Sequence, residues 1–313
     1  MISPHLREAA RRLQKKLEQA EPVKILVLAD DTEEEHHSDY SMLKTADVYF
    51  RSDTESIADI DVFLEKNQYE YVLNFTDLTP SNVVSLGVAC TGGPFYSKRS
   101  IRHAGVRVPK EYTPSDTIPF PVVMKLNESS GSIGISKVYS HSELRFSEDV
   151  LVEEFIDGRE FDVLVVENEN DPTAPSAFAI EIEFKVPGAI LDYERKWDTF
   201  SEQCRMRFLD EKREEDARLD QELKAFVVPV FVKHELNHYC RFDIRRRATT
   251  GELFLLDINP YCGVFYPRPD FGPGDSLVDR FIGHERFVQR MMLCDCRHIL
   301  GDQRRDGLGL TRK

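Results

Sequence analysis

The part of the chain from Pro121 onward is dense in short segments typical of β-strands, and this limits the possible folds more than any other feature. PVVMKLN, KVYS, VLVEEFI and REFDVLVVE each predict one strand, and AFAIEIEFKV alternates on a period of two. That period is typical of a strand with one buried face. CRFDIRRR and ELFLLDINP, separated by the turn ATTG, predict a β-hairpin. We therefore expect antiparallel sheets in this region.

The first part of the chain has a different organisation. Residues 23–29, VKILVLA, and 70–75, EYVLNF, predict strands, and the polar region between them has helical potential. This alternation indicates a small open α/β lobe. No GxGxxG fingerprint is present, so dinucleotide binding has no support. The charged N-terminus lacks the apolar segment of a secretory signal and predicts a surface helix capped by Ser3.

Helices and boundaries complete the predicted organisation. Residues 208–226 predict a charged helix with one buried face, and GHERFVQRMMLCDCRHIL predicts a closing helix. A glycine turn that runs into a helix is indicated by TGGPFYSKRSIRHAG. An extended linker is indicated by the next segment, VRVPKEYTPSDTIPFP, because proline favours extended backbone. We expect a helix at 1–20, the α/β lobe at 21–90, a central subdomain with a phosphate loop at 91–160, a C-terminal subdomain with a magnesium site at 161–300, and a tail at 301–313.

Composition excludes several classes of function. The formal net charge of −14 argues against a nucleic-acid partner, because phosphate backbones attract basic surfaces. No apolar run approaches the roughly 20 residues that span a bilayer, so we expect no membrane association. The six cysteines are scattered without a CxxC pair, which favours a reducing, cytoplasmic setting over a disulfide framework and gives no support to a zinc site.

The segment ESSGSIGIS, residues 128–136, follows Lys125 directly and is rich in small residues. Small residues allow backbone N–H groups to approach an anion, and the hydroxyls of Ser129, Ser130 and Ser132 add further donors. The segment therefore suits a lid over a triphosphate. A plain solvated hairpin loop is equally consistent with these residues.

Two further segments suit a nucleotide but are ambiguous alone. VEEFIDGREF, residues 152–161, predicts a strand entering a tight turn, whose backbone can bind the edge of adenine while Glu160 accepts from ribose hydroxyls. By itself this pattern favours an ordinary acidic hairpin. In DYERKW, Tyr193 and Lys196 are three residues apart and share a helical face, so that Lys196 can meet a γ-phosphate. By itself this pattern favours a solvated charged turn.

Hard oxygen ligands are predicted on the hairpin. Asp257 and Asn259 share one face of their strand because alternate residues do, and Asp243 lies on the partner strand with Arg241 on the same face. Such ligands suit Mg²⁺, which keeps some waters and also takes phosphate oxygens. We therefore favour a metal site here over a purely structural role.

Taken together and in this order, the segments resemble the ATP-grasp superfamily, and within it they are most similar to D-alanine–D-alanine ligase. The matching stretches are PVVMKLNESSGSIGISKV, VLVEEFIDGREFDVLVV, AIEIEF with LDYERKW, and CRFDIRRRATTGELFLLDINPYCG. The resemblance covers roughly residues 85–290. It implies an α/β (α+β) ATP-grasp fold, in which central and C-terminal antiparallel-sheet lobes sandwich ATP beside a small N-terminal lobe.

The resemblance also implies an ATP site. Two lysines would hold the α- and β-phosphates, and the loop from Ser129 to Ile135 would close over the triphosphate. Glu153 would take the adenine amino group, the backbone of the next residues would bind the base edge, and Glu160 would hold the ribose. The implied ATP-binding residues are Lys98, Lys125, Ser129, Ser130, Gly131, Ser132, Ile133, Glu153, Glu154, Phe155, Ile156 and Glu160.

The remaining implied roles concern catalysis. Asp243, Asp257 and Asn259 would bind two Mg²⁺ ions, for which Mn²⁺ can substitute, and Asp257 stands where the family has Glu. Lys196 would contact the γ-phosphate. Arg241, with a backbone N–H near Gly263, would steady the tetrahedral intermediate. The implied catalytic residues are Tyr193, Lys196, Arg241 and Gly263.

The substrate ends depart from the family pattern. LADDTEEEHHSDY lacks the glycine- and glutamate-containing motif that holds the first substrate's amino group, and PYCGVFYPRPDFGPGDSLV is longer and more aromatic than the family's turn. Ser276 and Leu277 correspond to its Ser-Leu pair near the second substrate. The insert Phe265–Pro267 either shapes the acceptor pocket or merely packs.

We therefore expect a cytoplasmic ATP-dependent ligase that joins an amino acid, a peptide or another small carboxylate to an amine, forming ADP and phosphate, with D-alanyl-D-alanine not the expected product. The resemblance also makes a homodimer an expectation. The alternatives are an ATP-grasp small-molecule kinase and a non-catalytic ATP-binding protein.

Overall fold

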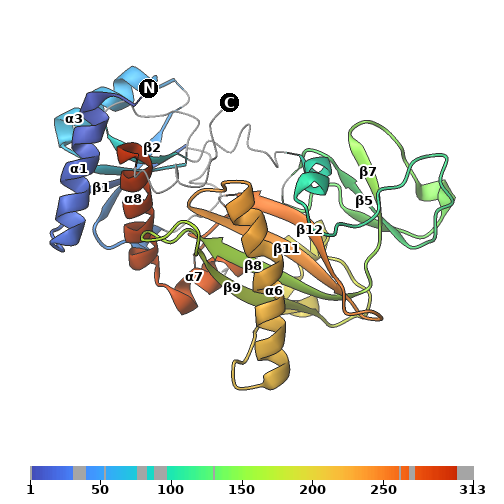
Figure 1. Cartoon of the computed structure of the whole chain (residues 1–313). Helices are drawn as coiled ribbons and strands as arrows, with labels where there is room; N and C mark the ends of the chain where they lie inside the picture. Colours follow the sequence, from blue (N-terminus) through green and yellow to red (C-terminus); the bar gives the residue numbers. More distant parts are fainter. Residues whose placement is uncertain are drawn as a thin grey trace. The chain divides into compact units, whose positions relative to one another are not determined.

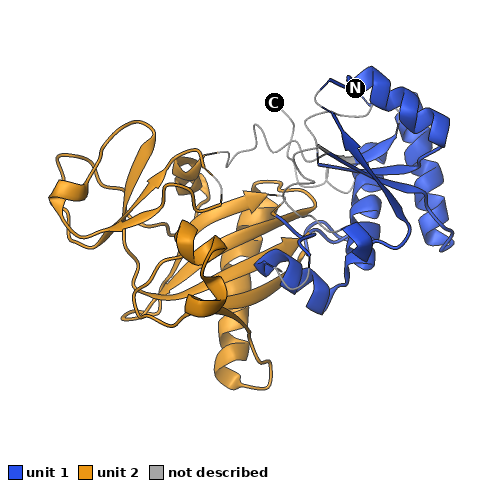
Figure 2. Ribbon diagram, turned by 180° about the vertical axis from the view of Figure 1, so that it is seen from behind, with its two compact units in different colours: residues 1–89, 167–174, 263–313 blue, residues 90–166, 175–262 orange. Residues whose placement is uncertain are grey.

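The computed structural model of the chain is shown in Figure 1, and it describes residues 2–30, 40–52, 54–75, 83–87, 97–129, 131–260, 262–267 and 272–301. The chain forms two compact units (Figure 2). Unit 1 comprises residues 1–89, 167–174 and 263–313, and unit 2 comprises residues 90–166 and 175–262. None of the helices within the described ranges combines the length and the apolar character that a bilayer span requires.

Unit 1 is built on a parallel sheet with the strand order β2-β1-β3-β4. The strands are β1 (Ile25–Asp30), β2 (Ala46–Arg51), β3 (Tyr71–Asn74) and β4 (Val84–Gly87), and the helices are α1 (Pro4–Glu18), η1 (Tyr40–Met42), α3 (Ile57–Asn67), α7 (Pro273–Phe281) and α8 (His284–Leu300). The predicted strands at 23–29 and 70–75 are confirmed as β1 and β3. The N-terminal helix is also confirmed, and Ser3 Oγ accepts from the Leu6 N–H at 3.1 Å.

The predicted closing helix is α8, which packs beside α1 in unit 1 (Figure 1). Its buried face carries Phe287, Val288 and Met291. The turn at residues 167–174 is tied to α8 because the buried Glu167 carboxylate pairs with Arg297 and His298. The C-terminal part of the chain therefore completes the unit that the N-terminal part begins.

Unit 2 contains two antiparallel sheets, as the strand pattern predicts. The smaller sheet has the order β6-β5-β7 and the larger one β10-β9-β8-β11-β12. The strands are β5 (Val122–Leu126), β6 (Ser136–Val138), β7 (Val150–Glu154), β8 (Gly158–Val166), β9 (Ser176–Phe184), β10 (Cys204–Phe208), β11 (Tyr239–Arg247) and β12 (Leu253–Pro260). The helices are η2 (Lys98–His103), η3 (His141–Glu143), α4 (Tyr193–Trp197), α5 (Phe200–Gln203) and α6 (Glu214–Lys233). The predicted hairpin is confirmed as β11–β12.

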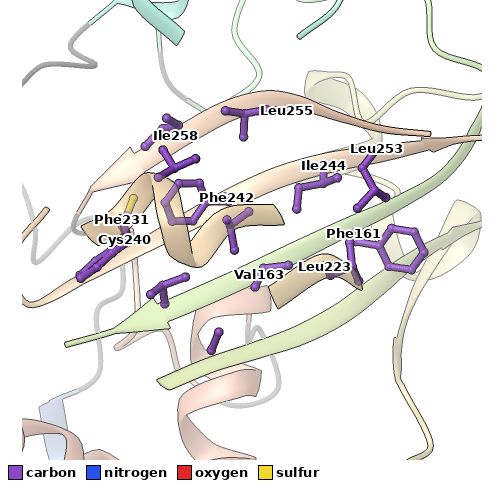
Figure 3. Packing of buried hydrophobic residues seen from close by; sticks show 14 of the residues in the cluster. Phe161, Val163, Leu223, Phe231, Cys240, Phe242, Ile244, Leu253, Leu255 and Ile258 are labelled. Atoms are coloured by element: carbon purple, nitrogen blue, oxygen red, sulfur yellow. The ribbon is translucent and has the colours of Figure 1, made fainter. Parts of the chain in front are cut away.

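Helix α6 covers one face of the larger sheet and forms the main core with it (Figure 3). The predicted helix ends at residue 226, whereas α6 continues through Pro229 to Lys233. The reason is that Val227, Val230 and Phe231 are buried and extend the face that Leu223 begins, at the spacing of a helix. Tertiary burial therefore outweighs the proline in this helix.

The opposite face of the larger sheet is charged. On β8, Phe161 points toward α6, and on β11 Phe242 does so. Successive side chains of a strand alternate between the two faces, so the neighbours of these residues in each strand point to the opposite face. These other-face residues are Glu160, Asp162, Arg241, Asp243 and Arg245. On β12, Asp257 pairs with Asp243 and Leu255 with Ile244, which leaves Leu256 as a bulge residue. The bulge changes which residues face the core, as bulges near functional sites often do.

Candidate functional site

The three predicted metal ligands come together on the charged face of the larger sheet. Asp243 is the cross-strand partner of Asp257, and Asn259 is the partner of Arg241 one pair further along. The Asn259 side-chain amide donates to Asp243 Oδ2 at 3.0 Å. The residues are therefore adjacent, and their role as metal ligands stays a prediction.

Both aspartates hold cations of the chain itself. Lys98 Nζ lies 2.6 Å from Asp257 Oδ2. Arg241 donates to both oxygens of Asp243, from Nε at 2.7 Å and from Nη2 at 3.1 Å. Burial alone would raise the pKa of Asp243, but the pairing with Arg241 outweighs it and the pKa lies below its ordinary value. Positive charge is thus already concentrated at these oxygens.

Lys125 links the two sheets of unit 2. Its ammonium lies 2.8 Å from Glu153 Oε2 on β7 and donates to the carbonyl of the bulge residue Leu256 at 3.1 Å. Both side chains of the pair are almost fully buried, and burial raises the pKa of Glu153 even though Lys125 opposes the shift. The two predicted phosphate lysines therefore contact neighbouring residues of β12, Leu256 and Asp257.

The predicted base and ribose contacts converge on Arg245, which the sequence analysis did not single out. Arg245 is buried and donates to Glu160 at 2.8 Å and to the Ile156 carbonyl at 3.0 Å. Its guanidinium lies 5.3 Å from the ring centroid of Phe155, and the Lys137 ammonium lies 3.5 Å from the same centroid. The same-face rule would have found Arg245, because it lies two residues after Asp243.

In the same turn, the Glu154 carboxylate pairs with Arg247. The backbone N–H of Glu154 donates to the Lys110 carbonyl at 2.8 Å. The backbone donor of Glu154 is therefore already used by the chain. A role of Glu154 in binding the base edge stays a prediction, as it does for the other residues of the turn.

The predicted lid loop is held at its tip by an indole. Trp197 Nε1 donates to the Gly131 carbonyl at 2.8 Å, a contact that the sequence analysis did not anticipate. Ser132 adopts a φ of 63°, and the Ile133 side chain is 52% exposed. Ser130 lies outside the described residues. The Ser129 hydroxyl is buried and, among the residues that the structure describes, has no hydrogen-bond partner.

Lys196 lies on α4, close enough to Arg241 and Asp243 for their charges to shift its pKa. Burial lowers its pKa first, and the positive charge of Arg241 lowers it further, while Asp243 and Asp162 oppose the shift. Tyr193 begins the same helix, and its side chain is 50% exposed. Contacts of Lys196 and Tyr193 with a phosphate stay predictions.

Three other predicted residues belong to unit 1. A Cβ on Gly263 would stand 2.4 Å from the Tyr266 ring, which explains a glycine there. Leu277 on α7 is fully buried, and the Ser276 N–H donates to the Gly272 carbonyl at 3.0 Å. The roles of Gly263, Ser276 and Leu277 stay predictions.

One residue of the aromatic insert, Phe265, packs against other rings of unit 1. Phe265 is buried, with ring centroids 5.5 Å from Tyr40, 5.8 Å from Phe75 and 5.7 Å from His284. Phe265 therefore belongs to an aromatic cluster within its own unit.

The residues of unit 2 fit a nucleotide with a divalent cation. Two carboxylates and an amide oxygen offer the hard donors that Mg²⁺ prefers, and they lie on adjacent positions of one hairpin. Lys98 and Lys125 can exchange carboxylate partners for phosphate oxygens. The buried Ser129 hydroxyl supplies a donor in the lid, which suits an anion.

Comparison with known proteins agrees with this geometry. The family model described as D-ala D-ala ligase C-terminus matches residues 102–266, more than half of the chain. D-alanine–D-alanine ligase from Ralstonia nicotianae is 29% identical over 196 residues, which are 56% of this chain and 52% of that protein. This chain spans about half the length of the curated relatives that it matches.

Solved structures show the same fold. The ATP complex of D-alanine–D-alanine ligase from Bacillus anthracis superposes with a TM-score of 0.57 at 13% identity, covering 90% of this chain and 100% of that one. An L-amino acid ligase from Bacillus licheniformis gives a TM-score of 0.55 at 12% identity, covering 88% of this chain and 74% of that one. The family model matches more than half of the chain and spans the hairpin, the predicted lid loop and the charged sheet face, so this chain belongs to the D-ala D-ala ligase C-terminus family.

Proposed function

We propose that this chain is an ATP-dependent ligase that activates a carboxylate as an acyl phosphate and joins it to an amine, releasing ADP and inorganic phosphate. The observation that carries the proposal is the charged sheet face, where Asp243 pairs with Asp257 and Asn259 pairs with Arg241 on the same hairpin. Lys98 and Lys125 both contact β12 beside them. Membership of the ligase family supports the same chemistry.

The reaction that we propose has two steps. One oxygen of the substrate carboxylate attacks the γ-phosphorus of ATP, and the bond from that phosphorus to the oxygen shared with ADP breaks. The amine nitrogen then attacks the acyl carbon, a C–N bond forms, inorganic phosphate leaves, and the amine gives a proton to water. Phosphoryl transfer of this kind requires positioning and charge neutralisation more than covalent help from the protein.

The side chains of unit 2 supply those requirements. Lys98 and Lys125 would leave their carboxylate partners for phosphate oxygens, and Lys196 would approach the γ-phosphate. Arg241 would steady the negative charge that develops on the acyl oxygen of the tetrahedral intermediate. Asp243, Asp257 and Asn259 would hold Mg²⁺, in the two-ion arrangement that we expect, and the metal would supply positive charge next to the phosphates. The lid around Gly131 would exclude water that otherwise hydrolyses the acyl phosphate.

We infer that the substrates are an amino acid, a peptide or another small carboxylate, together with an amine. The name of the Bacillus licheniformis neighbour, an L-amino acid ligase, supports this class. The two segments that depart from the family pattern, residues 28–40 and 260–278, argue against D-alanyl-D-alanine as the product. Residues 31–39, 261 and 268–271 of these segments lie outside the described residues.

The first test uses the chain's single tryptophan. Trp197 donates to the Gly131 carbonyl of the lid, so closure of the lid over Mg-ATP is expected to change its fluorescence. Asp257→Asn removes a ligand charge with little change of shape and is expected to abolish the response. Glu214→Gln, on α6 with a side chain 94% exposed, removes the same charge elsewhere and is the matched control.

The second test identifies the reaction. A thermal-shift screen with Mg-ATP against amino acids and peptides finds ligands, because binding to the folded state raises the unfolding temperature. Phosphate release that requires both a carboxylate and an amine, with an amide product, supports the ligase. A stable phosphorylated product without an amide would indicate a kinase. Nucleotide binding without turnover for any pair would indicate a non-catalytic protein.

A further inference from the structure

Asp162 is a buried carboxylate on the charged sheet face to which the proposed function gives no role. It lies on β8 and is only 4% exposed. Its cross-strand partner is Asp243, the predicted metal ligand on β11. Two charged carboxylates directly opposite each other on one sheet face repel, so a nearby cation stabilises the charged form of the pair.

Arg241 is that cation. Its cross-strand partner is Leu164, which places Arg241 diagonally across from Asp162 and within reach of a long side chain. Arg241 Nε lies 2.7 Å from Asp243 Oδ1 and 3.5 Å from Asp162 Oδ2. Among the residues that the structure describes, Arg241 is the only cation within ion-pair distance of Asp162.

Metal binding would change this arrangement. If the Asp243 oxygens turn to a divalent cation, Arg241 loses both of its short hydrogen bonds, and its side chain is only 12% exposed. A buried charge without a partner strongly destabilises the folded protein, so the metal-loaded state would be unfavourable if Arg241 gained no new partner. Asp162 is already 3.5 Å away and needs a shift of less than 1 Å to make a charge-assisted hydrogen bond of about 2.8 Å.

We propose that Asp162 is a positioning residue that takes over Arg241 when Asp243 binds the metal. The inference rests on the proposed function, because it concerns the metal-loaded state of that site. The exchange keeps the Arg241 guanidinium in place while Asp243 is released to the cation. Asp162 therefore favours metal binding by supplying the partner that Arg241 would otherwise lose.

The direct test is a crystal structure of the full chain with Mg²⁺ and a non-hydrolysable ATP analogue. The expected result is a contact between Arg241 and Asp162 shortened from 3.5 Å to hydrogen-bond distance, with the Asp243 oxygens facing the metal. An Arg241 that stays on Asp243, or that turns away from both aspartates, overturns the proposal. A structure without metal or nucleotide at saturating ligand overturns the proposed function itself.

The second test is a double-mutant cycle on Mn²⁺ binding in the presence of the same analogue. Asp162→Asn is expected to weaken Mn²⁺ binding at least about tenfold in the otherwise unchanged protein, the size of one lost charge-assisted contact. In an Arg241→Met background the same substitution is expected to cost less than about threefold, because the residue through which it acts is gone.

The cycle separates positioning through Arg241 from direct attraction of the cation by Asp162. If Asp162 merely attracted the cation by its charge, its removal would weaken binding equally in both backgrounds, and the proposal would be wrong. Glu181→Gln is the matched control, since Glu181 is a buried, ion-paired carboxylate on the α6 face of β9. It is expected to lower stability and leave Mn²⁺ affinity unchanged. No Mn²⁺ binding by the unchanged protein would contradict the proposed function rather than the role of Asp162 within it.

Discussion

The buried pair of Lys125 and Glu153 allows a sharp prediction about stability. Lys125→Met keeps most of the aliphatic chain and removes the ammonium. Glu153 then keeps its buried position, with a side chain 8% exposed, and loses the cation at 2.8 Å. The Leu256 carbonyl also loses a donor at 3.1 Å. Breaking a buried pair by removing one partner typically costs about 3–5 kcal/mol, so we expect the free energy of unfolding to fall by about 4 kcal/mol.

The loss is expected to depend on pH with a definite sign. Burial raises the pKa of Glu153 even beside Lys125, and without Lys125 that pKa rises further. A carboxyl with a raised pKa binds more protons in the folded state than in the unfolded state, so stability falls as pH rises. The deficit of the variant is therefore largest near pH 8 and smaller at pH 5, where Glu153 takes up a proton at less cost.

Urea unfolding monitored by Trp197 fluorescence measures this effect, because the single tryptophan lies in the same unit as the pair. Lys125→Met/Glu153→Leu replaces the whole pair with apolar side chains and is expected to recover most of the loss. The reasoning is refuted if Lys125→Met costs less than about 1 kcal/mol at pH 8. An equal loss at pH 5 and pH 8, or a double variant as unstable as the single one, refutes it as well.

Two further predictions concern the core and the surface of α6. Leu223→Ala is expected to lower the free energy of unfolding, measured with urea, by about 3 kcal/mol, because Leu223 is fully buried against the sheet. Arg218→Ala is expected to change it by less than about 0.5 kcal/mol, because the Arg218 side chain is 68% exposed. Hydrogen bonding by Arg207 lowers the pKa of Asp216 to about 2. The charged Asp216 therefore stabilises the fold above about pH 4, and this contribution is lost as the pH falls through 2. Asp216→Asn is therefore expected to cost about 2 kcal/mol at pH 7 and almost nothing at pH 2 in the same assay, and an equal cost at both pH values would contradict the ion-pair explanation.

The strands that the sequence analysis missed are mostly exposed ones. β2 and β10 lie at the edges of their sheets, and most of their residues are partly exposed. An edge strand of this kind buries few apolar side chains, so its apolar pattern is weak. Its formation therefore depends on the neighbouring strand with which it pairs. The inner strands β8 and β9, by contrast, carry a pattern that burial requires, and the sequence predicts them.

The candidate site divides in the same way. The period of two places Asp257 with Asn259, and the hairpin turn places Asp243 opposite them; both are local properties that the sequence determines by itself. The pairing of β11 with β8 is not local, and it alone brings Asp162 to Asp243 and Glu160 to Arg245.

The sequence by itself thus determines the inner strands, the helices with a continuous apolar face, the hairpin and the family. Only the tertiary structure decides that Lys98 and Lys125 meet β12, that residues 263–301 complete the N-terminal unit, and that Arg241 lies between two aspartates. The physical reason is that periodicity reports which face of an element is buried, whereas the partner of a buried charge depends on which distant segment the fold places beside it.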